Sequence, residues 1–276
     1  MHMRYKRYLL LLLLVLPSMV RLRAQDDTQL SQYWAMPSYY NAGAAGIYEK
    51  LNLRAATRQQ WVGMPGAPKS FLVLADMPLR FLKADHGIGL QLSNDSYGLF
   101  KTTSFGIQYA YKVKLWGGQL SLGLQLGLIS QIFDGTEVFI PESDYHQQTD
   151  DAIPTSEVQG TAFDVGFGVY YTHKYFYAGL SSTHLSQPAI SFDENYEGSI
   201  TRAYYFIAGG NIPLRNALYE VQPSMMVKTT FQMTQAELTL RLRYNRFIWG
   251  GLAYRWNDAP YRKRRAEVMK YLSVTA

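Results

Sequence analysis

Long stretches of this chain alternate apolar and polar residues with a period of two, and this pattern restricts the fold more than any other feature. Between residues 120 and 128 every second residue is leucine, and the residues between are serine, glycine or glutamine. Residues 162–171 and 236–245 alternate in the same way. Successive side chains of a strand point to opposite faces, so the pattern predicts β-strands with one apolar and one polar face.

Eleven stretches are candidates for such strands. They lie near residues 51–61, 70–79, 86–94, 101–115, 119–131, 160–172, 175–184, 202–212, 218–230, 234–245 and 247–257. Most are long enough to cross a bilayer as tilted strands. Short connections alternate with long ones at 133–159 and 185–201, and aromatic residues gather near the strand ends. We therefore predict an all-β fold, an antiparallel transmembrane β-barrel over residues 51–257.

The polar face of these strands leaves two readings open. In a membrane barrel it faces a watery or plugged lumen, and we expect five residues there: Gln125, Asp164, Glu237, Arg241 and Arg243. In a soluble exported β-sandwich or lipocalin-like barrel the same residues would face solvent. Alternation alone does not separate the two, but strand length and the aromatic ends favour the membrane barrel.

The first 24 residues have the order of a secretory signal peptide. Arg4, Lys6 and Arg7 precede an apolar run at 9–16, and the small residue Ala24 follows. The run is too short for a membrane-spanning helix, so we expect cleavage after Ala24, with an uncleaved anchor as the alternative. The chain has no cysteine, and its net charge of +6 lies partly in this segment and partly in residues 262–265, so a nucleic acid partner is not indicated.

The segment "SQYWAMPSYYNAGAAG", residues 31–46, is too aromatic for a solvated linker and too rich in proline and glycine for a regular element. Irregular backbone at membrane depth is tolerated where protein or water surrounds it. We therefore interpret residues 25–50 as a plug or docking segment. Tyr33, Trp34, Tyr39 and Tyr40 should be largely buried in it.

The search for catalytic and metal sites is negative. The five histidines share no metal-ligand spacing and have no thiol beside them. The acidic residues between 134 and 151 match no calcium loop. We predict no catalytic residue, no metal site and no cofactor, and so no enzyme.

Three blocks of sequence carry a resemblance to the PorP/SprF family. Residues 31–46 resemble its N-terminal block through Ser31, Gln32, Tyr33, Asn41 and Gly46, although Ala42 replaces the usual proline. "RQQWVGMPGAP", residues 58–68, is similar to the next block through Arg58, Gln60 and Trp61. "GIGLQLSNDSYG", residues 87–98, follows the third through Asn94, Asp95 and Gly98.

The resemblance implies a Bacteroidetes outer-membrane protein of the type IX secretion and gliding motility machinery. Its expected partners are the periplasmic ring and lipoprotein components of that machinery, a secreted cell-surface adhesin and the lipid bilayer. The alternative function is an outer-membrane diffusion channel or hydrophobic-ligand transporter. An outer-membrane hydrolase is a third reading.

The end of the chain departs from this resemblance. After residue 259 the similarity is lost, and residues 258–276 read as a basic tail outside the barrel. Members of the family have about 14 strands, an even number as single-chain bacterial barrels prefer. We therefore expect a chain that is C-terminally truncated or frameshifted near residues 258–260, with a natural short variant as the alternative.

Overall fold

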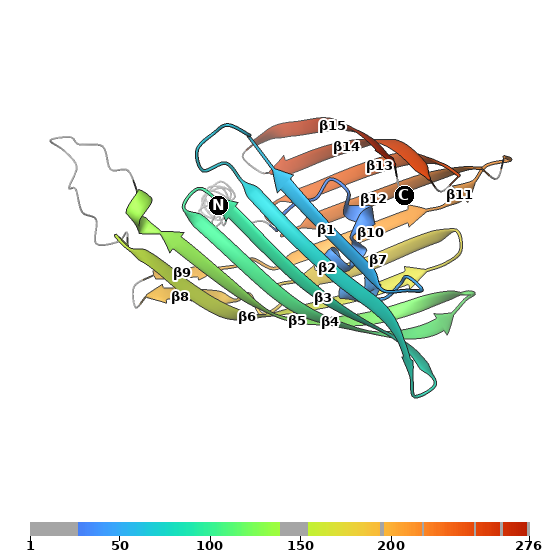
Figure 1. The fold of residues 1–276 in the computed structure, drawn as a ribbon, viewed down its shortest axis with the longest axis horizontal. Coiled ribbons are helices and arrows are strands. Elements are labelled where there is room, and N and C mark those ends of the chain that lie inside the picture. Colours follow the sequence, from blue (N-terminus) through green and yellow to red (C-terminus); the bar gives the residue numbers. More distant parts are fainter. Residues whose placement is uncertain are drawn as a thin grey trace, which may run out of the picture.

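The computed structural model describes residues 27–138, 154–193, 196–216, 218–245, 247–259 and 262–274. Figure 1 shows one large antiparallel sheet that curls around a short helical segment near the N-terminus. The predicted signal peptide lies outside the described residues. Within them, no helix is long and apolar enough to cross a membrane.

The strands of the structure have the following bounds: β1 (Asn52–Gln59), β2 (Lys69–Phe81), β3 (Ala84–Tyr97), β4 (Phe100–Leu115), β5 (Gly118–Asp134), β6 (Glu157–Thr172), β7 (Phe176–Thr183), β8 (Ala189–Asp193), β9 (Tyr196–Ser199), β10 (Ala203–Gly210), β11 (Ile212–Pro213), β12 (Tyr219–Thr229), β13 (Thr234–Tyr244), β14 (Ile248–Ala259) and β15 (Arg262–Val274). The helical elements are short: η2 (Tyr33–Ala35), α2 (Pro37–Tyr40), η3 (Ala42–Ala44) and η4 (Gly135–Glu137).

The sheet is a meander in which each strand pairs antiparallel with the next. Its order is β1-β2-β3-β4-β5-β6-β7-β10-β12-β13-β14-β15, with β11 beside β12. The hairpin β8-β9 forms a separate two-stranded sheet in the connection from β7 to β10. Among the described residues β1 and β15 are the two edges of the large sheet, and they do not pair with each other.

The two faces of the sheet differ as the alternation predicts. In β5, Leu124 is 44% exposed on the convex side, whereas Ser121 is 1% exposed on the concave side. β13 repeats the arrangement, with Leu240 exposed and Glu237 buried. An outward apolar wall around a polar interior is the arrangement of transmembrane barrels. The predicted fold class is confirmed.

The connections divide the sheet into two ends. At the end we call the turn end, β2 joins β3 through residues 82–83 and β4 joins β5 through residues 116–117. Trp116 and Gly117 have φ of 48° and 75°, the positive values that a two-residue hairpin turn of this twist requires. At the opposite end, the loop end, residues 60–68, 135–156 and 184–202 make the longer connections.

Two predicted non-strand regions contain strands. Residues 262–274, expected in a basic tail, form β15, which pairs with β14 from Ile248↔Val274 to Ala259↔Arg262. That prediction was wrong for these residues, because hydrogen bonding to the edge of β14 does not require alternating side chains. Residues 185–201, expected as a loop, contain β8 and β9, which are too short to show a period.

Candidate functional site

Residues 27–46, which we call the lumen segment, lie on the concave side of the sheet and pack against its strands in the interior (Figure 1). Tyr33 is 0% exposed, Tyr39 and Tyr40 are buried, and Trp34 is partly buried against them. The segment turns tightly because Pro37 begins α2 and the Asn41 side chain accepts a hydrogen bond from the Gly43 amide at the start of η3. Its aromatic side chains therefore form a core shared with the strands.

The wall carries glycines where the lumen segment approaches most closely. A Cβ atom at Gly87 would overlap the Ala45 carbonyl, one at Gly123 would overlap the Ala42–Gly43 backbone, and one at Gly168 would overlap the Asn41 side chain. These glycines of β3, β5 and β6 leave the space that residues 41–45 occupy, and we call the three of them the glycine bed.

The middle of the lumen segment is hydrogen-bonded to four strands. The Asn41 side-chain amide donates to the carbonyls of Val169 (3.0 Å) and Leu180 (3.1 Å), which are paired residues of β6 and β7. The Ser181 hydroxyl donates to the Tyr40 carbonyl at 2.6 Å. The Tyr33 hydroxyl donates to Ser224 of β12 at 3.0 Å. In addition, the Gln108 side chain of β4 donates to the Ser38 carbonyl at 2.8 Å.

Trp34 of the lumen segment packs in a cluster of aromatic and charged side chains from the strands. The Arg241 guanidinium lies 3.4 Å from the centre of the Trp34 ring, and the Trp34 and Trp249 rings meet edge to face at 4.8 Å. A buried guanidinium over an indole is a favourable cation–π pair. Beside it, the buried Glu237 and Arg255 pair at 2.6 Å.

The turn end of the segment is anchored at Gly46. Its amide donates to the Asp76 carboxylate at 2.9 Å, and its carbonyl accepts from the Lys112 ammonium. Gly46 has φ +65°, and a Cβ there would overlap the Met77 carbonyl, so only glycine fits.

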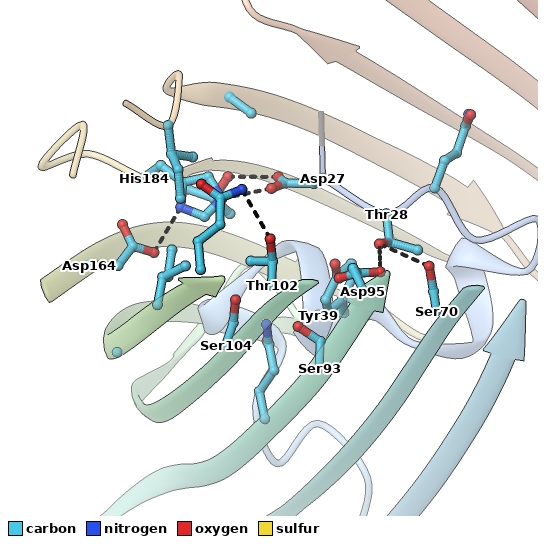
Figure 2. Close-up of a pocket in the computed structure, with 18 of the residues that line it drawn as sticks. Asp27, Thr28, Tyr39, Ser70, Ser93, Asp95, Thr102, Ser104, Asp164 and His184 are labelled. Atoms are coloured by element: carbon cyan, nitrogen blue, oxygen red, sulfur yellow. Dashed lines mark hydrogen bonds and ion pairs between the residues drawn. The ribbon is translucent and has the colours of Figure 1, made fainter. Parts of the chain in front are cut away.

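The loop end of the segment is anchored at Asp27, as Figure 2 shows. His184 lies between two carboxylates, with Nε2 2.6 Å from Asp27 and Nδ1 2.9 Å from Asp164. The Tyr205 hydroxyl donates to Asp27 at 2.5 Å, and the Lys228 ammonium donates to the Asp27 carbonyl at 3.1 Å. We call the Asp27, His184 and Asp164 arrangement the loop-end clamp.

Electrostatics favour the charged form of the clamp. Burial acts against charge on both residues, but Asp27 and Asp164 outweigh it and raise the pKa of His184 to about 10. Likewise, the charges of His184 and Lys228 overcome burial and hold the pKa of Asp27 well below its usual range. The clamp is therefore an ion pair at neutral pH.

The motif residues predicted from the first sequence block differ in burial and in their contacts. In the first block, Tyr33, Asn41 and Gly46 anchor the lumen segment, while Ser31 is half-buried and Gln32 exposed.

The second and third blocks meet at the loop end. The Gly98 amide donates to the Gly66 carbonyl at 2.9 Å, and Asp95 accepts from Thr28 of the lumen segment. The remaining motif residues have local contacts: Arg58 donates to Gln60, Asn94 donates to Thr103, and the Trp61 side chain is exposed.

The five residues expected in the lumen lie as follows. Asp164 belongs to the loop-end clamp, Glu237 pairs with Arg255, and Arg241 stacks on Trp34. Gln125 accepts from Gln108 at 2.8 Å, and Arg243 pairs with Glu220 at 2.5 Å.

Sequence reasoning missed the loop-end clamp. Asp27 and His184 are 157 residues apart, and neither lies in a recognisable motif. No local pattern could have joined them, because the curvature of the sheet brings them together. In the described residues, no group of three or more His, Cys, Asp or Glu side chains is placed to hold a metal ion.

A cavity of about 440 Å³ lies at the loop end between the lumen segment and the wall. Its lining combines residues of the lumen segment with hydroxyl side chains of the strands, among them Thr28, Tyr39, Ser93, Thr102 and Ser104 (Figure 2). The Gln131 carboxamide also lines it. We call it the loop-end cavity.

The fold and the packed lumen define the class of this protein: an antiparallel membrane β-barrel whose interior is occupied by its own N-terminal segment. Residues 22–261 match the family described as type IX secretion system membrane protein PorP/SprF. The chain belongs to that family, and the predicted resemblance to it is confirmed.

Among solved structures, the chain is similar to the crystal structure of the beta domain of the Bordetella autotransporter BrkA, with 14% identity, a TM-score of 0.34, and coverage of 80% of this chain and 96% of that one. None of the curated proteins compared with the chain matches it.

Proposed function

We propose that this protein is a non-enzymatic outer-membrane scaffold of the type IX secretion machinery that docks periplasmic ring components and supports export or anchoring of a secreted adhesin. The family match over residues 22–261 carries the proposal. The packed lumen supports it, since a segment held at both ends makes a rigid support rather than an open passage.

The turn end is the surface we assign to periplasmic docking. Bacterial outer-membrane barrels place short turns in the periplasm and long loops outside. A shallow groove at this end is lined by Lys114, Trp116, His173 and Lys174, with no acidic residue in its lining. Trp116 is 85% exposed. An aromatic anchor flanked by cations suits a partner with an acidic surface.

Co-purification of periplasmic ring components with tagged variants tests this assignment. Trp116→Ala combined with Lys174→Glu should reduce recovery of the ring components at least tenfold, since both the anchor and the charge complementarity are lost. The matched control is Trp61→Ala, which removes an exposed tryptophan at the loop end. Heat-modifiable migration in electrophoresis should show that both variants still fold. Equal recovery from both would overturn the docking assignment.

The alternative of a diffusion channel or hydrophobic-ligand transporter finds less support. The lumen segment occupies the interior, and the remaining loop-end cavity is lined largely by polar side chains. A steady, wide conductance in planar bilayers would favour the channel.

A further inference from the structure

We propose that the loop-end cavity binds a short neutral saccharide of about two linked sugar rings. The cavity lies at the opposite end of the lumen from the turn-end groove, so the proposal stands apart from periplasmic docking. Its volume of about 440 Å³ is within the range of sites for small organic ligands.

The lining is built mainly from groups that hydrogen-bond without carrying charge. Hydroxyls come from Ser93, Thr102 and Ser104, and carboxamides come from Gln91 and Gln131. Sugar hydroxyls donate and accept at once, which suits a wall that mixes both roles. A fatty chain would offer these groups neither donors nor acceptors.

The charged residues of the lining are already neutralised by one another or held in hydrogen bonds. Asp27 and Asp164 both bind His184, Asp95 accepts from Thr28, and Arg58 donates to Gln60. An anionic ligand would approach three carboxylates, and a cationic ligand would have to displace existing partners. A neutral ligand requires neither.

Gln131 is a lining residue whose side chain is held in place. The side chain is 2% exposed, and its amide nitrogen donates to Tyr97 and Thr102, both at 3.2 Å. Those two bonds fix the carboxamide, whereas its Oε1 is buried without a hydrogen-bond partner. Gln131 thus contributes a fixed carboxamide to the wall of the cavity.

Tyrosine rings complete the site. Tyr39, Tyr97 and Tyr205 line the cavity, and Tyr205 is held in place through its hydroxyl bond to Asp27. Aromatic rings offer flat apolar surface beside a polar edge. A sugar ring has the same combination, with C–H groups on its faces and hydroxyls around its rim.

Calorimetry on the purified full chain tests the proposal. The protein is kept in a zwitterionic detergent, because a detergent with a sugar headgroup would compete. The neutral probes are cellobiose, lactose, mannobiose and chitobiose, and the charged comparators are sialyllactose and spermidine. We expect saturable binding of at least one neutral probe and a matching rise in thermal stability, since a ligand that binds only the folded state stabilises it.

Two variants place the binding in the cavity. Gln131→Met removes a lining carboxamide and should raise the dissociation constant at least tenfold. Ser104→Ala removes a lining hydroxyl and should raise it about threefold, the loss expected for one hydrogen bond. The control is Gln159→Met, the same change at an exposed position on the adjacent strand β6, opposite Ile132. It should leave binding unchanged.

The outcomes that overturn the proposal are distinct. Absence of binding by all four neutral probes, tighter binding of either charged comparator, or equal effects of Gln131→Met and Gln159→Met would each do so. The Trp116 variant could lose recovery of the ring components and still bind saccharide. That result would support this inference independently of periplasmic docking, because the two sites are at opposite ends.

Discussion

At the scale of single residues, this structure depends on side chains that contact the lumen segment rather than on those that form strands. His184 and the wall glycines show this most clearly. His184 holds the start of the segment, whereas Gly87, Gly123 and Gly168 make room for its end. His184 acts through its charge, and the glycines act through their small volume. Each effect can be tested separately.

His184→Gln should remove a pH dependence of stability. Because the folded pKa of His184 is raised from 6.5 to about 10, its stabilising contribution is complete below pH 6.5 and is lost as the pH rises to about 10. Asp27, whose folded pKa is lowered, contributes above its unfolded pKa and loses that contribution only in acid. We therefore measure the free energy of unfolding of both proteins in urea at pH 6, 8 and 9.5. With rising pH, that of the wild type should decrease more than that of the variant. Parallel profiles would refute the loop-end clamp as an ion pair.

Gly123→Ala should dislodge the lumen segment. The added Cβ would overlap the backbone of residues 42–43, which cannot rotate away, so we expect a loss of about 1–3 kcal/mol. Limited proteolysis should then cut within residues 27–46 of the variant and not of the wild type. Gly106→Ala is the control, because the three atoms nearest its Cβ belong to the Gln125 side chain, at 3.2–3.5 Å, and not to the backbone of the lumen segment. Similar cleavage of both variants would mean that the glycine bed is unimportant.

At the scale of elements, the long strands of the large sheet whose side chains the structure describes have one outward apolar face and one face toward the lumen. β5 shows the pattern over its length, with exposed leucines on one face and Ser121, Gly123 and Gly127 buried on the other. The burial follows from the parity of the sequence, since a shift of one residue would exchange the faces.

Leu124→Arg should destabilise the barrel in lipid by about 2–4 kcal/mol, because it places a charge on the outward face near the middle of β5. Gln125→Arg should cost far less, since Gln125 faces the polar interior and contacts Gln108. Folding titrations in lipid vesicles measure both. Equal tolerance of the two substitutions would mean that the assigned faces are wrong.

At the scale of the whole molecule, the lumen segment runs from the loop end at Asp27 to the turn end at Gly46. The wall around it is continuous from β1 to β15, and those two strands are its edges in the described residues. The molecule thus has two unlike ends, one with the loop-end cavity and one with the basic turn-end groove.

Cysteine labelling should reveal which end faces outward. The chain has no cysteine, so Phe231→Cys at the loop end and Trp116→Cys at the turn end can each be read without background. A membrane-impermeant maleimide should label the first in intact cells and the second only after the outer membrane is opened. The reverse order of labelling would invert the orientation and remove the basis for periplasmic docking at the turn end.

The sequence by itself determined the fold class, because alternation is a local property that any sheet converts into two unlike faces. It located eleven strands of the meander and the aromatic segment that the structure packs in the lumen. Only the tertiary structure decided the loop-end clamp, the glycine bed and the pairing of β15. These depend on which residues the curvature and register of the sheet bring together, and such contacts between distant positions leave no periodic trace in the sequence.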